Sequence, residues 1–172
     1  VDLTGKTLGL IGLGRIGQAM APRRAGFAME LVASDPYVDA ETMRGLGVEP
    51  TDLETLLARA DFVSIHCVLT PETRGLMGAA ELARMKESAF LIDVSRGAIV
   101  DEAALVTALQ AGRLAGAGFD VFPDEPLKPG HPLLGMDTVI LTPHLAWYTR
   151  EAFERVERQT LDSILDVLAG RR

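Results

Sequence analysis

The sequence predicts a doubly wound α/β fold, in which one parallel sheet carries helices on both faces. First, short runs rich in β-branched and other apolar residues alternate along the chain with helical patterns. Second, these runs are apolar almost throughout, so the strands are expected to be buried on both faces, as in parallel sheets. Third, 172 residues suit one domain with a sizeable core, or at most a pair of small ones. We therefore expect a single domain.

The expected elements follow from these runs and from the residues that punctuate them. Strands are predicted at residues 7–11, 30–34, 62–66, 89–94, 115–121 and 139–142, and helices at 15–25, 52–60, 79–85 and 101–111. Asp101 is expected to cap the last of these helices, and Gly112 to end it in a left-handed turn. Pro22 lacks an N–H, so the first helix should kink or end there. Four prolines predict an irregular stretch over residues 122–135.

A G-x-G-x-x-G pattern formed by Gly12, Gly14 and Gly17 joins the first strand to the first helix. Gly12 permits a tight turn, Gly14 lets the backbone approach a pyrophosphate, and Gly17 lets the helix pack closely on its strand. Asp35 follows the second strand, roughly 20 residues on, where a carboxylate can bind the adenosine ribose hydroxyls. Its charge would repel a 2′-phosphate. Glycines alone would indicate only a turn, but the combination predicts a Rossmann-type site for NAD rather than NADP.

Polar residues follow the later strands, at the carboxyl ends where open α/β sheets bind ligands. Arg96 can hold a carboxylate through two charge-assisted hydrogen bonds. The local sequence also allows Arg96 to be an ordinary surface arginine. His144 can exchange a proton near neutral pH, and a glutamate such as Glu125 would favour its charged form. A lone histidine is more often structural. Its place among an arginine, Glu125 and Asp120 at equivalent strand ends favours catalysis.

Composition excludes several other classes of function. Because 24 acidic residues outweigh 17 basic ones, for a net charge of −7, the chain has no electrostatic footprint for nucleic acid. No apolar run approaches the roughly 18 residues of a membrane span. The single Cys67 cannot form an internal disulfide, which fits the cytoplasm, and its strand neighbour His66 should point to the opposite face. The three histidines lack zinc-like spacing, so no metal is expected.

From residue 1 to about residue 169, the sequence resembles the NAD-binding domain of the D-2-hydroxyacid dehydrogenases. The resemblance rests on several motifs in the same order, at residues 12–17, 34–37, 69–75, 94–97, 116–122, 124–126 and 141–144. It implies hydride transfer between NAD(H) and a small 2-oxo or 2-hydroxy acid.

The resemblance also implies roles for individual residues. By position, Arg96 matches the arginine that binds the substrate carboxylate, Glu125 the partner of the catalytic histidine, and His144 the acid/base itself. Asp120 matches an aspartate near the nicotinamide ring. Other positions match segments that line the cofactor: Arg15, Ile16, Cys67, Val68, Thr70, Val94, Ser95, Arg96, His144, Ala146 and Trp147.

Two alternatives concern the chain as a whole. The Ala146, Trp147 and Tyr148 segment resembles the C-terminal-binding co-repressors of this family, which bind NAD and act mainly through protein partners, although such aromatics more commonly lie in a core or an interface. The family resemblance also implies a protein of two lobes that forms a homodimer. Because the chain starts at Val1, close to the first strand, we expect residues 1–172 to be an NAD-binding domain without its substrate-binding lobe, inactive or weakly active alone, and dimeric through this domain.

Overall fold

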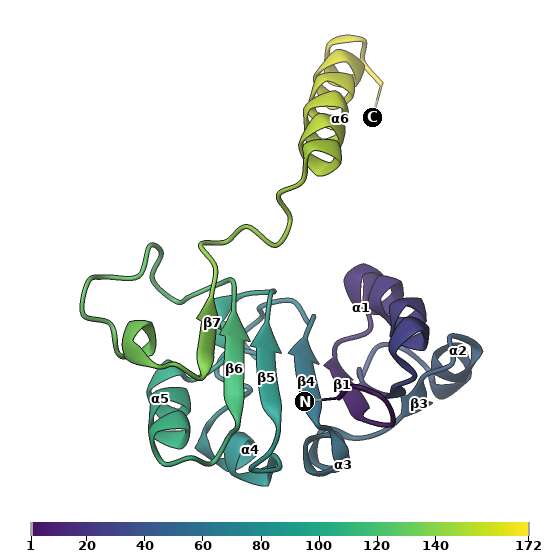
Figure 1. The fold of residues 1–172 in the computed structure, drawn as a ribbon. Coiled ribbons are helices and arrows are strands. Elements are labelled where there is room, and N and C mark those ends of the chain that lie inside the picture. The colour runs from purple at the N-terminus through teal and green to yellow at the C-terminus, as the bar shows by residue number, and fades with distance from the viewer. Residues whose placement is uncertain (1, 172) are drawn as a thin grey trace.

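The computed structural model describes residues 2–171, and these form the expected doubly wound α/β domain (Figure 1). Their parallel sheet contains seven strands in the order β3-β2-β1-β4-β5-β6-β7. The strands are β1 (Thr7–Ile11), β2 (Glu30–Ser34), β3 (Glu49–Pro50), β4 (Phe62–Ile65), β5 (Phe90–Asp93), β6 (Gly116–Phe119) and β7 (Val139–Leu141). Strand order reverses between β1 and β4, the place where open α/β sheets bind ligands. The predicted fold class is confirmed, while Val1 and Arg172 lie outside the described residues.

The helices alternate with the strands. The α-helices are α1 (Arg15–Met20), α2 (Ala40–Gly45), α3 (Leu53–Arg59), α4 (Ala79–Arg84), α5 (Glu102–Gln110) and α6 (Arg150–Leu168). Three short 3₁₀ helices join them, namely η1 (Ala21–Phe27), η2 (Gly97–Ile99) and η3 (Pro132–Gly135). The six predicted strands and the four predicted helices are all present, with ends that differ by a few residues.

Strand β1 shows why the strands read as apolar throughout. Leu8 and Leu10 are buried in the core cluster that also contains Leu13 and Met43. Ile11 belongs to the other cluster, on the face covered by α3, α4 and α5. On that face a Cβ added to Gly9 would lie 2.7 Å from the Leu56 side chain. Both faces of β1 are therefore buried.

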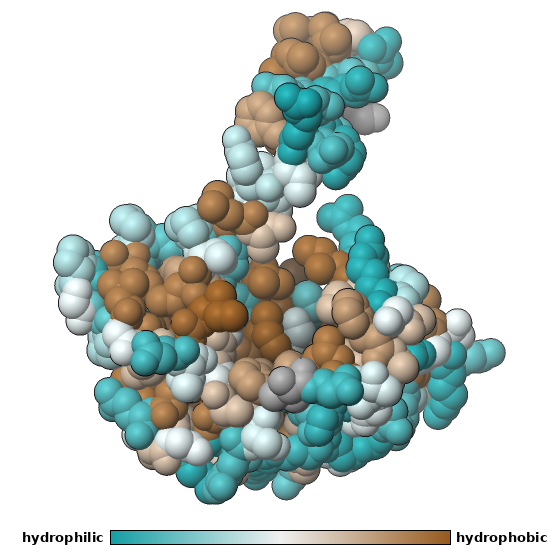
Figure 2. Space-filling model, viewed as in Figure 1, coloured by the Kyte–Doolittle hydropathy of each residue, from teal (hydrophilic) through white to brown (hydrophobic). Residues whose placement is uncertain are grey.

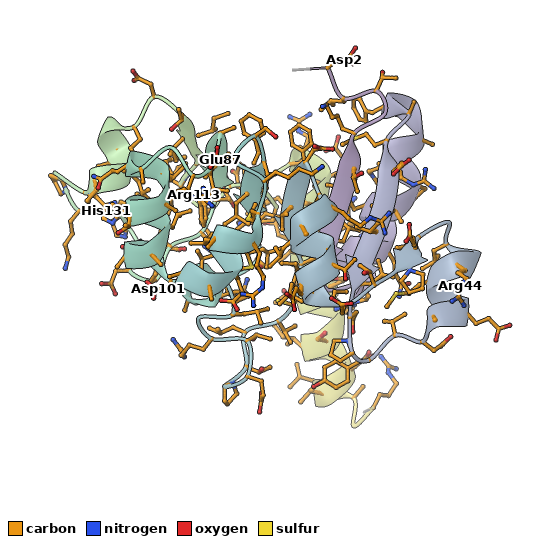
Figure 3. All side chains as sticks on the ribbon, turned by 90° about the horizontal axis from the view of Figure 1, so that it is seen from below. Asp2, Arg44, Glu87, Asp101, Arg113 and His131 are labelled. Carbon is orange, nitrogen blue, oxygen red and sulfur yellow. The ribbon has the colours of Figure 1, made fainter. Side chains whose placement is uncertain are left out.

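Residues at helix ends confirm three local predictions. Asp101 lies at the start of α5 (Figure 3), and its side chain accepts a hydrogen bond of 3.0 Å from the Ala104 N–H. Gly112, beyond the end of α5, has a φ of +67°. Helix α1 stops at Met20 and continues only as the 3₁₀ helix η1, so Pro22 ends the α-helix as predicted.

Other elements were not predicted. Helices α2 and α6 and the two-residue strand β3 were missed, and η3 corrects the expectation that residues 122–135 would lack regular structure. The His131 ring explains η3: its Nδ1 accepts from the Leu133 N–H, and its Nε2 lies 2.9 Å from Glu102 of α5. The N–H at the first position of a helix has no partner within the helix, so a proline is tolerated there. Pro132 therefore begins the turn rather than preventing it.

Helix α6 stands apart from the sheet at the end of an extended segment (Figure 1). No residue of α6 is buried, and part of its surface is apolar (Figure 2). Exposed apolar residues along it are Phe153, Val156, Leu161, Ile164, Leu165, Val167 and Leu168.

Candidate functional site

The polar residues singled out in the sequence follow the carboxyl ends of the strands. The ends of β1, β2 and β4 border a cleft of about 730 Å³. Of the predicted cofactor-binding residues, this cleft is lined by Gly12, Gly14, Asp35, Cys67, Val68 and Thr70. Arg15 and Ile16 lie beside it in the first turn of α1. Gly17 is buried in α1, and the other predicted residues follow β5, β6 and β7.

The three glycines have three different surroundings. Gly12 has a φ of +93°, and a Cβ there would lie 2.5 Å from the Cys67 backbone N. At Gly17 a Cβ would lie 2.5 Å from the Gly12 carbonyl oxygen, so only glycine lets α1 pack this closely on β1. At Gly14 a Cβ would meet no atom within 4 Å. The backbone at Gly14 is therefore open to the cleft, which fits a pyrophosphate that approaches it.

Asp35 connects the glycine turn to the end of β2. Its Oδ2 accepts a hydrogen bond of 2.7 Å from the Leu13 N–H, and its Oδ1 accepts one of 2.8 Å from the Tyr37 N–H. Each carboxylate oxygen has further acceptor capacity, so Asp35 can also accept from ribose hydroxyls. A charged carboxylate in this cleft fits NAD better than a cofactor with a 2′-phosphate.

Cys67 and His66 follow β4 and both line the cleft, but no hydrogen bond joins them among the described residues. Burial and the charge of Asp93 raise the pKa of the Cys67 thiol to about 11, and burial lowers the pKa of His66. The His66 Nε2 lies 3.0 Å from the Ser64 hydroxyl. A thiol with so high a pKa stays protonated at neutral pH, which disfavours a role for Cys67 as a nucleophile paired with His66.

The turn after β5 carries Val94, Ser95 and Arg96. The buried Asp93 shapes this turn, because its Oδ1 accepts from the Ser95 N–H at 2.8 Å and from the Ser95 hydroxyl at 2.6 Å. Arg96 is exposed, and its Nη1 donates to the Ser95 carbonyl at 2.6 Å. Within residues 2–171 its guanidinium makes no ion pair with a carboxylate, so it can still bind an anionic ligand.

Glu125 and His144 meet although they lie on different segments. His144 Nδ1 and Glu125 Oε2 are 2.8 Å apart, and the other Glu125 oxygen accepts from the Phe122 N–H at 2.9 Å. The bond to His144 and that from Phe122 hold the pKa of Glu125 below its usual value. A carboxylate can only accept, so Nδ1 carries the shared hydrogen and Nε2 is left for proton exchange. The family resemblance had implied this pair.

Asp120 lies at the end of β6, below the segment that carries His144. Its Oδ1 accepts from the Thr142 hydroxyl and from the Leu145 N–H, the latter at 2.7 Å, and its Oδ2 accepts from the Ala146 N–H at 2.8 Å. Burial opposes the charge, but these donors and the nearby His144 hold the pKa of Asp120 below its usual value. Asp120 is therefore a charged acceptor in a buried position.

Ala146, Trp147 and Tyr148 lie on the surface between β7 and α6. The side chains of Trp147 and Tyr148 are 48% and 58% exposed, and their rings meet edge to face with centroids 5.2 Å apart. The indole N–H of Trp147 donates to the His144 carbonyl at 3.1 Å. These aromatics were expected to lie either in the core or at an interface. In the structure of residues 2–171 they do not lie in the core.

The cleft also has lining residues that sequence reasoning missed. They come from the segments after β2 and β3 and from the loop after β4: Pro36, Tyr37, Val38, Thr51, Asp52, Leu53, His66, Glu72, Thr73 and Leu76. Some belong to motifs that carried the family resemblance, which was the available signal. A helix was predicted from residue 52, but Thr51 to Leu53 were not expected at the cleft because β3, which precedes them, was not predicted.

Residues 2–171 contain no group of three or more His, Cys, Asp or Glu side chains arranged to hold a metal ion. They also contain no helix long and apolar enough to cross a membrane.

Comparison with known proteins gives consistent matches. Residues 1–146 match the family model described as D-isomer specific 2-hydroxyacid dehydrogenase, NAD binding domain. A D-3-phosphoglycerate dehydrogenase from Archaeoglobus fulgidus is 42% identical over 170 residues, which are 99% of this chain and 32% of that protein. A glyoxylate reductase from Korarchaeum cryptofilum is 43% identical over 169 residues, which are 98% of this chain and 51% of that protein.

A solved structure shares both the fold and the match. The D-isomer specific 2-hydroxyacid dehydrogenase from Lactobacillus delbrueckii ssp. bulgaricus, in its NAD complexed form, matches with a TM-score of 0.89 at 34% identity. The match covers 100% of this chain and 56% of that one. The chain thus spans between a third and little more than half of the length of these relatives.

Proposed function

This chain belongs to the D-isomer specific 2-hydroxyacid dehydrogenase family as its NAD-binding domain, and from that premise we propose that it supplies the cofactor half of an oxidoreductase. The reaction is hydride transfer between NAD(H) and a small 2-hydroxy or 2-oxo acid. The observation that carries the proposal is the 2.8 Å contact between His144 Nδ1 and Glu125 Oε2. The names of the relatives, a glyoxylate reductase and D-3-phosphoglycerate dehydrogenases, support a substrate of this class.

His144 acts as the general acid and base in this proposal. NADH, when bound, supplies the hydride that the carbonyl carbon of the substrate accepts. Protonated His144 gives its Nε2 proton to the carbonyl oxygen, which becomes the hydroxyl, and takes a proton back in the oxidation direction. Glu125 accepts from the Nδ1–H, which fixes the tautomer of the ring, and its negative charge stabilises the positive imidazolium.

Arg96 binds the substrate carboxylate in the same proposal. Its exposed guanidinium lies in the turn after β5 and has five N–H donors, of which one contacts the Ser95 carbonyl. The others can form the paired hydrogen bonds that a carboxylate accepts. Gly12, Gly14 and Asp35 would hold the pyrophosphate and the ribose on the other side of the sheet's switch point.

The experiment that tests this function is a set of variants of the natural protein that contains this domain, assayed with NADH and a panel of 2-oxo acids. His144→Ala should lower turnover by about 10²- to 10⁴-fold, the usual contribution of general acid–base catalysis. The affinity for NADH should change less than threefold. Glu125→Gln should lower turnover less than His144→Ala does, because the amide still accepts a hydrogen bond.

Asp124→Asn is the matched control, because Asp124 is an exposed acid next to Glu125. It should leave turnover unchanged. Full activity of His144→Ala would remove His144 from the acid/base role. The absence of turnover with every 2-oxo acid would overturn the proposed reaction.

A second function is supported by the exposed aromatic pair Trp147 and Tyr148. In this alternative the domain is an NAD-responsive, co-repressor-like module that binds proteins and turns over little or no substrate. Protein or peptide capture that depends on NADH, with negligible turnover, would favour it. Loss of that capture in Trp147→Ala, with NADH affinity retained, would assign the capture to this surface.

Three expectations for the whole protein stay predictions. We infer that segments outside residues 1–172 form the substrate-binding lobe, which the partial coverage of the relatives supports. The chain alone should therefore bind NADH but reduce 2-oxo acids poorly, and robust reduction would contradict this. A homodimer formed through this domain, and a cytoplasmic location, also stay predictions. Sedimentation of the purified protein tests the homodimer, and fractionation of cells tests the cytoplasmic location.

A further inference from the structure

All three donors to the Asp120 carboxylate flank His144 in the sequence. The Thr142 hydroxyl precedes the histidine, and the Leu145 and Ala146 N–H groups follow it, at 2.7 and 2.8 Å from the carboxylate. Asp120 is itself only 3% exposed and closes strand β6. The carboxylate therefore fixes the backbone on both sides of His144 to a rigid strand of the sheet.

The backbone at His144 needs such support. His144 has a φ of +56°, in the left-handed region that residues with a Cβ rarely adopt. Such conformations persist where the surrounding structure holds them, and they cluster at functional sites. The His144 backbone carbonyl accepts a hydrogen bond of 3.1 Å from the indole N–H of Trp147.

The His144 ring cannot set its own orientation by packing. Its side chain is well exposed, and its one hydrogen bond among the described residues is the contact from Nδ1 to Glu125. Whether that contact forms depends on the direction in which the left-handed backbone projects the ring. Glu125 is held separately, through the Phe122 N–H. The two partners thus meet only if the backbone at residue 144 keeps its conformation.

We propose that Asp120 is a positioning residue that holds His144 in its left-handed conformation and so brings the imidazole to Glu125. The catalytic consequence rests on the proposed function, but the geometric one does not. The segment around His144 engages both carboxylate oxygens, so in this proposal Asp120 acts through the histidine.

The test is Asp120→Asn in the chain of 172 residues, read at His144 itself. Asparagine keeps one carbonyl oxygen but turns the other acceptor into a donor, which opposes the N–H of either Ala146 or Leu145. Two probes report the result without turnover. ¹⁵N–¹H correlation spectra of the imidazole show which ring nitrogen is protonated, and the emission of Trp147, the only tryptophan in the chain, reports on the bond to the His144 carbonyl.

The expected result is a change in the protonated nitrogen of His144 and a shifted Trp147 emission. Asp93→Asn is the matched control, because Asp93 is a buried aspartate at the end of the neighbouring strand that contacts Ser95 instead. It should leave both signals as they are. Unchanged signals in Asp120→Asn, or the same change in Asp93→Asn, would overturn the proposal.

Two further measurements separate the possible failures. If Asp120→Asn does not fold, Thr142→Val removes only the hydroxyl donor and should move both signals in the same direction by a smaller amount; no movement would overturn the proposal. In the natural protein that contains this domain, Asp120→Asn should lower kcat at least tenfold. An active His144→Ala would reject the proposed function, whereas unmoved His144 signals in Asp120→Asn would reject the positioning role alone.

Discussion

Asp93 is a buried acid that lacks a full set of partners. Its Oδ1 accepts two hydrogen bonds from Ser95, but its Oδ2 is buried without a hydrogen-bond partner among the described residues. Burial raises the pKa of Asp93 from 3.8 to about 6, even though the contacts to Ser95 and the charge of Arg96 oppose the shift. The charged form of Asp93 is therefore unfavourable in the folded state. The same side chain holds the turn that carries Arg96, through its hydrogen bonds from Ser95.

The pH dependence of this cost can be measured with Asp93→Asn. Between pH 3.8 and about 6 the folded state holds a proton that the unfolded state releases, so Asp93 makes the free energy of unfolding fall as pH rises through this window. The loss is on the order of 3 kcal/mol. Asparagine does not titrate, so the stability of the variant relative to wild type should increase between pH 4 and pH 7 in urea denaturation. A difference that stays constant with pH would contradict the raised pKa.

At the scale of elements, the turn from β1 to α1 separates what glycine does for folding from what it does for binding. Gly12→Ala places a Cβ 2.5 Å from the Cys67 N at a φ of +93°, and the backbone conformation alone should cost about 1 to 3 kcal/mol. Gly14→Ala meets nothing within 4 Å, so the domain should keep its stability. We expect Gly14→Ala to weaken NADH binding at least tenfold, measured by fluorescence titration. Normal NADH affinity in Gly14→Ala would show that the pyrophosphate does not approach this backbone.

The cap of α5 gives a prediction about stability alone. The Asp101 side chain satisfies the Ala104 N–H, one of the first N–H groups of the helix, which have no partner within it. Asp101→Ala should lower the free energy of unfolding by about 1 kcal/mol, measured by urea denaturation. Asp101→Asn keeps an acceptor at the same place and should lose less than about 0.5 kcal/mol. Equal losses in the two variants would mean that the cap does not stabilise α5.

Elements were predictable where a local signal agreed with burial. Pro22 ends α1 because it lacks the N–H that an α-helix needs, and this effect does not depend on what the helix packs against. Strand β3 has only two residues, one of them Pro50, so no periodicity could show it. Its absence from the prediction also hid the cleft wall from Thr51 to Leu53. Helix α6 was missed although its apolar residues recur at helical spacing, because no strand follows it to complete the alternating pattern.

The candidate site was predictable in its members but not in its connections. The glycines and Asp35 follow from motif spacing, and the Glu125–His144 pair followed from the family resemblance. The donors to Asp120 could not be read from the sequence, because they depend on the turn at residues 142–146 and on a positive φ at His144. Asp93 was not singled out, since an aspartate in an apolar run gives no sign that one of its oxygens is unpaired.

At the scale of the whole molecule, the two parts of the site are joined by backbone contact as well as by the sheet. A Cβ at Gly97, next to Arg96, would lie 2.2 Å from the Phe122 carbonyl carbon. The Phe122 N–H in turn donates to Glu125, which contacts His144. The turn after β5 and the segment after β7 are therefore linked through the chain that follows β6, so the proposed carboxylate-binding and acid/base groups are held by one connected set of contacts.

Helix α6 is the exception to this connected structure, which leads to a prediction for the chain without residues 150–172. None of the helix is buried against the sheet (Figure 1), so its removal should change the free energy of unfolding of the sheet by less than about 0.5 kcal/mol. Because α6 exposes apolar side chains from Phe153 to Leu168, the shortened chain should also bind less of the fluorescent dye ANS. Urea denaturation and dye titration check both expectations. A loss of more than about 1 kcal/mol would mean that α6 packs on the sheet in solution.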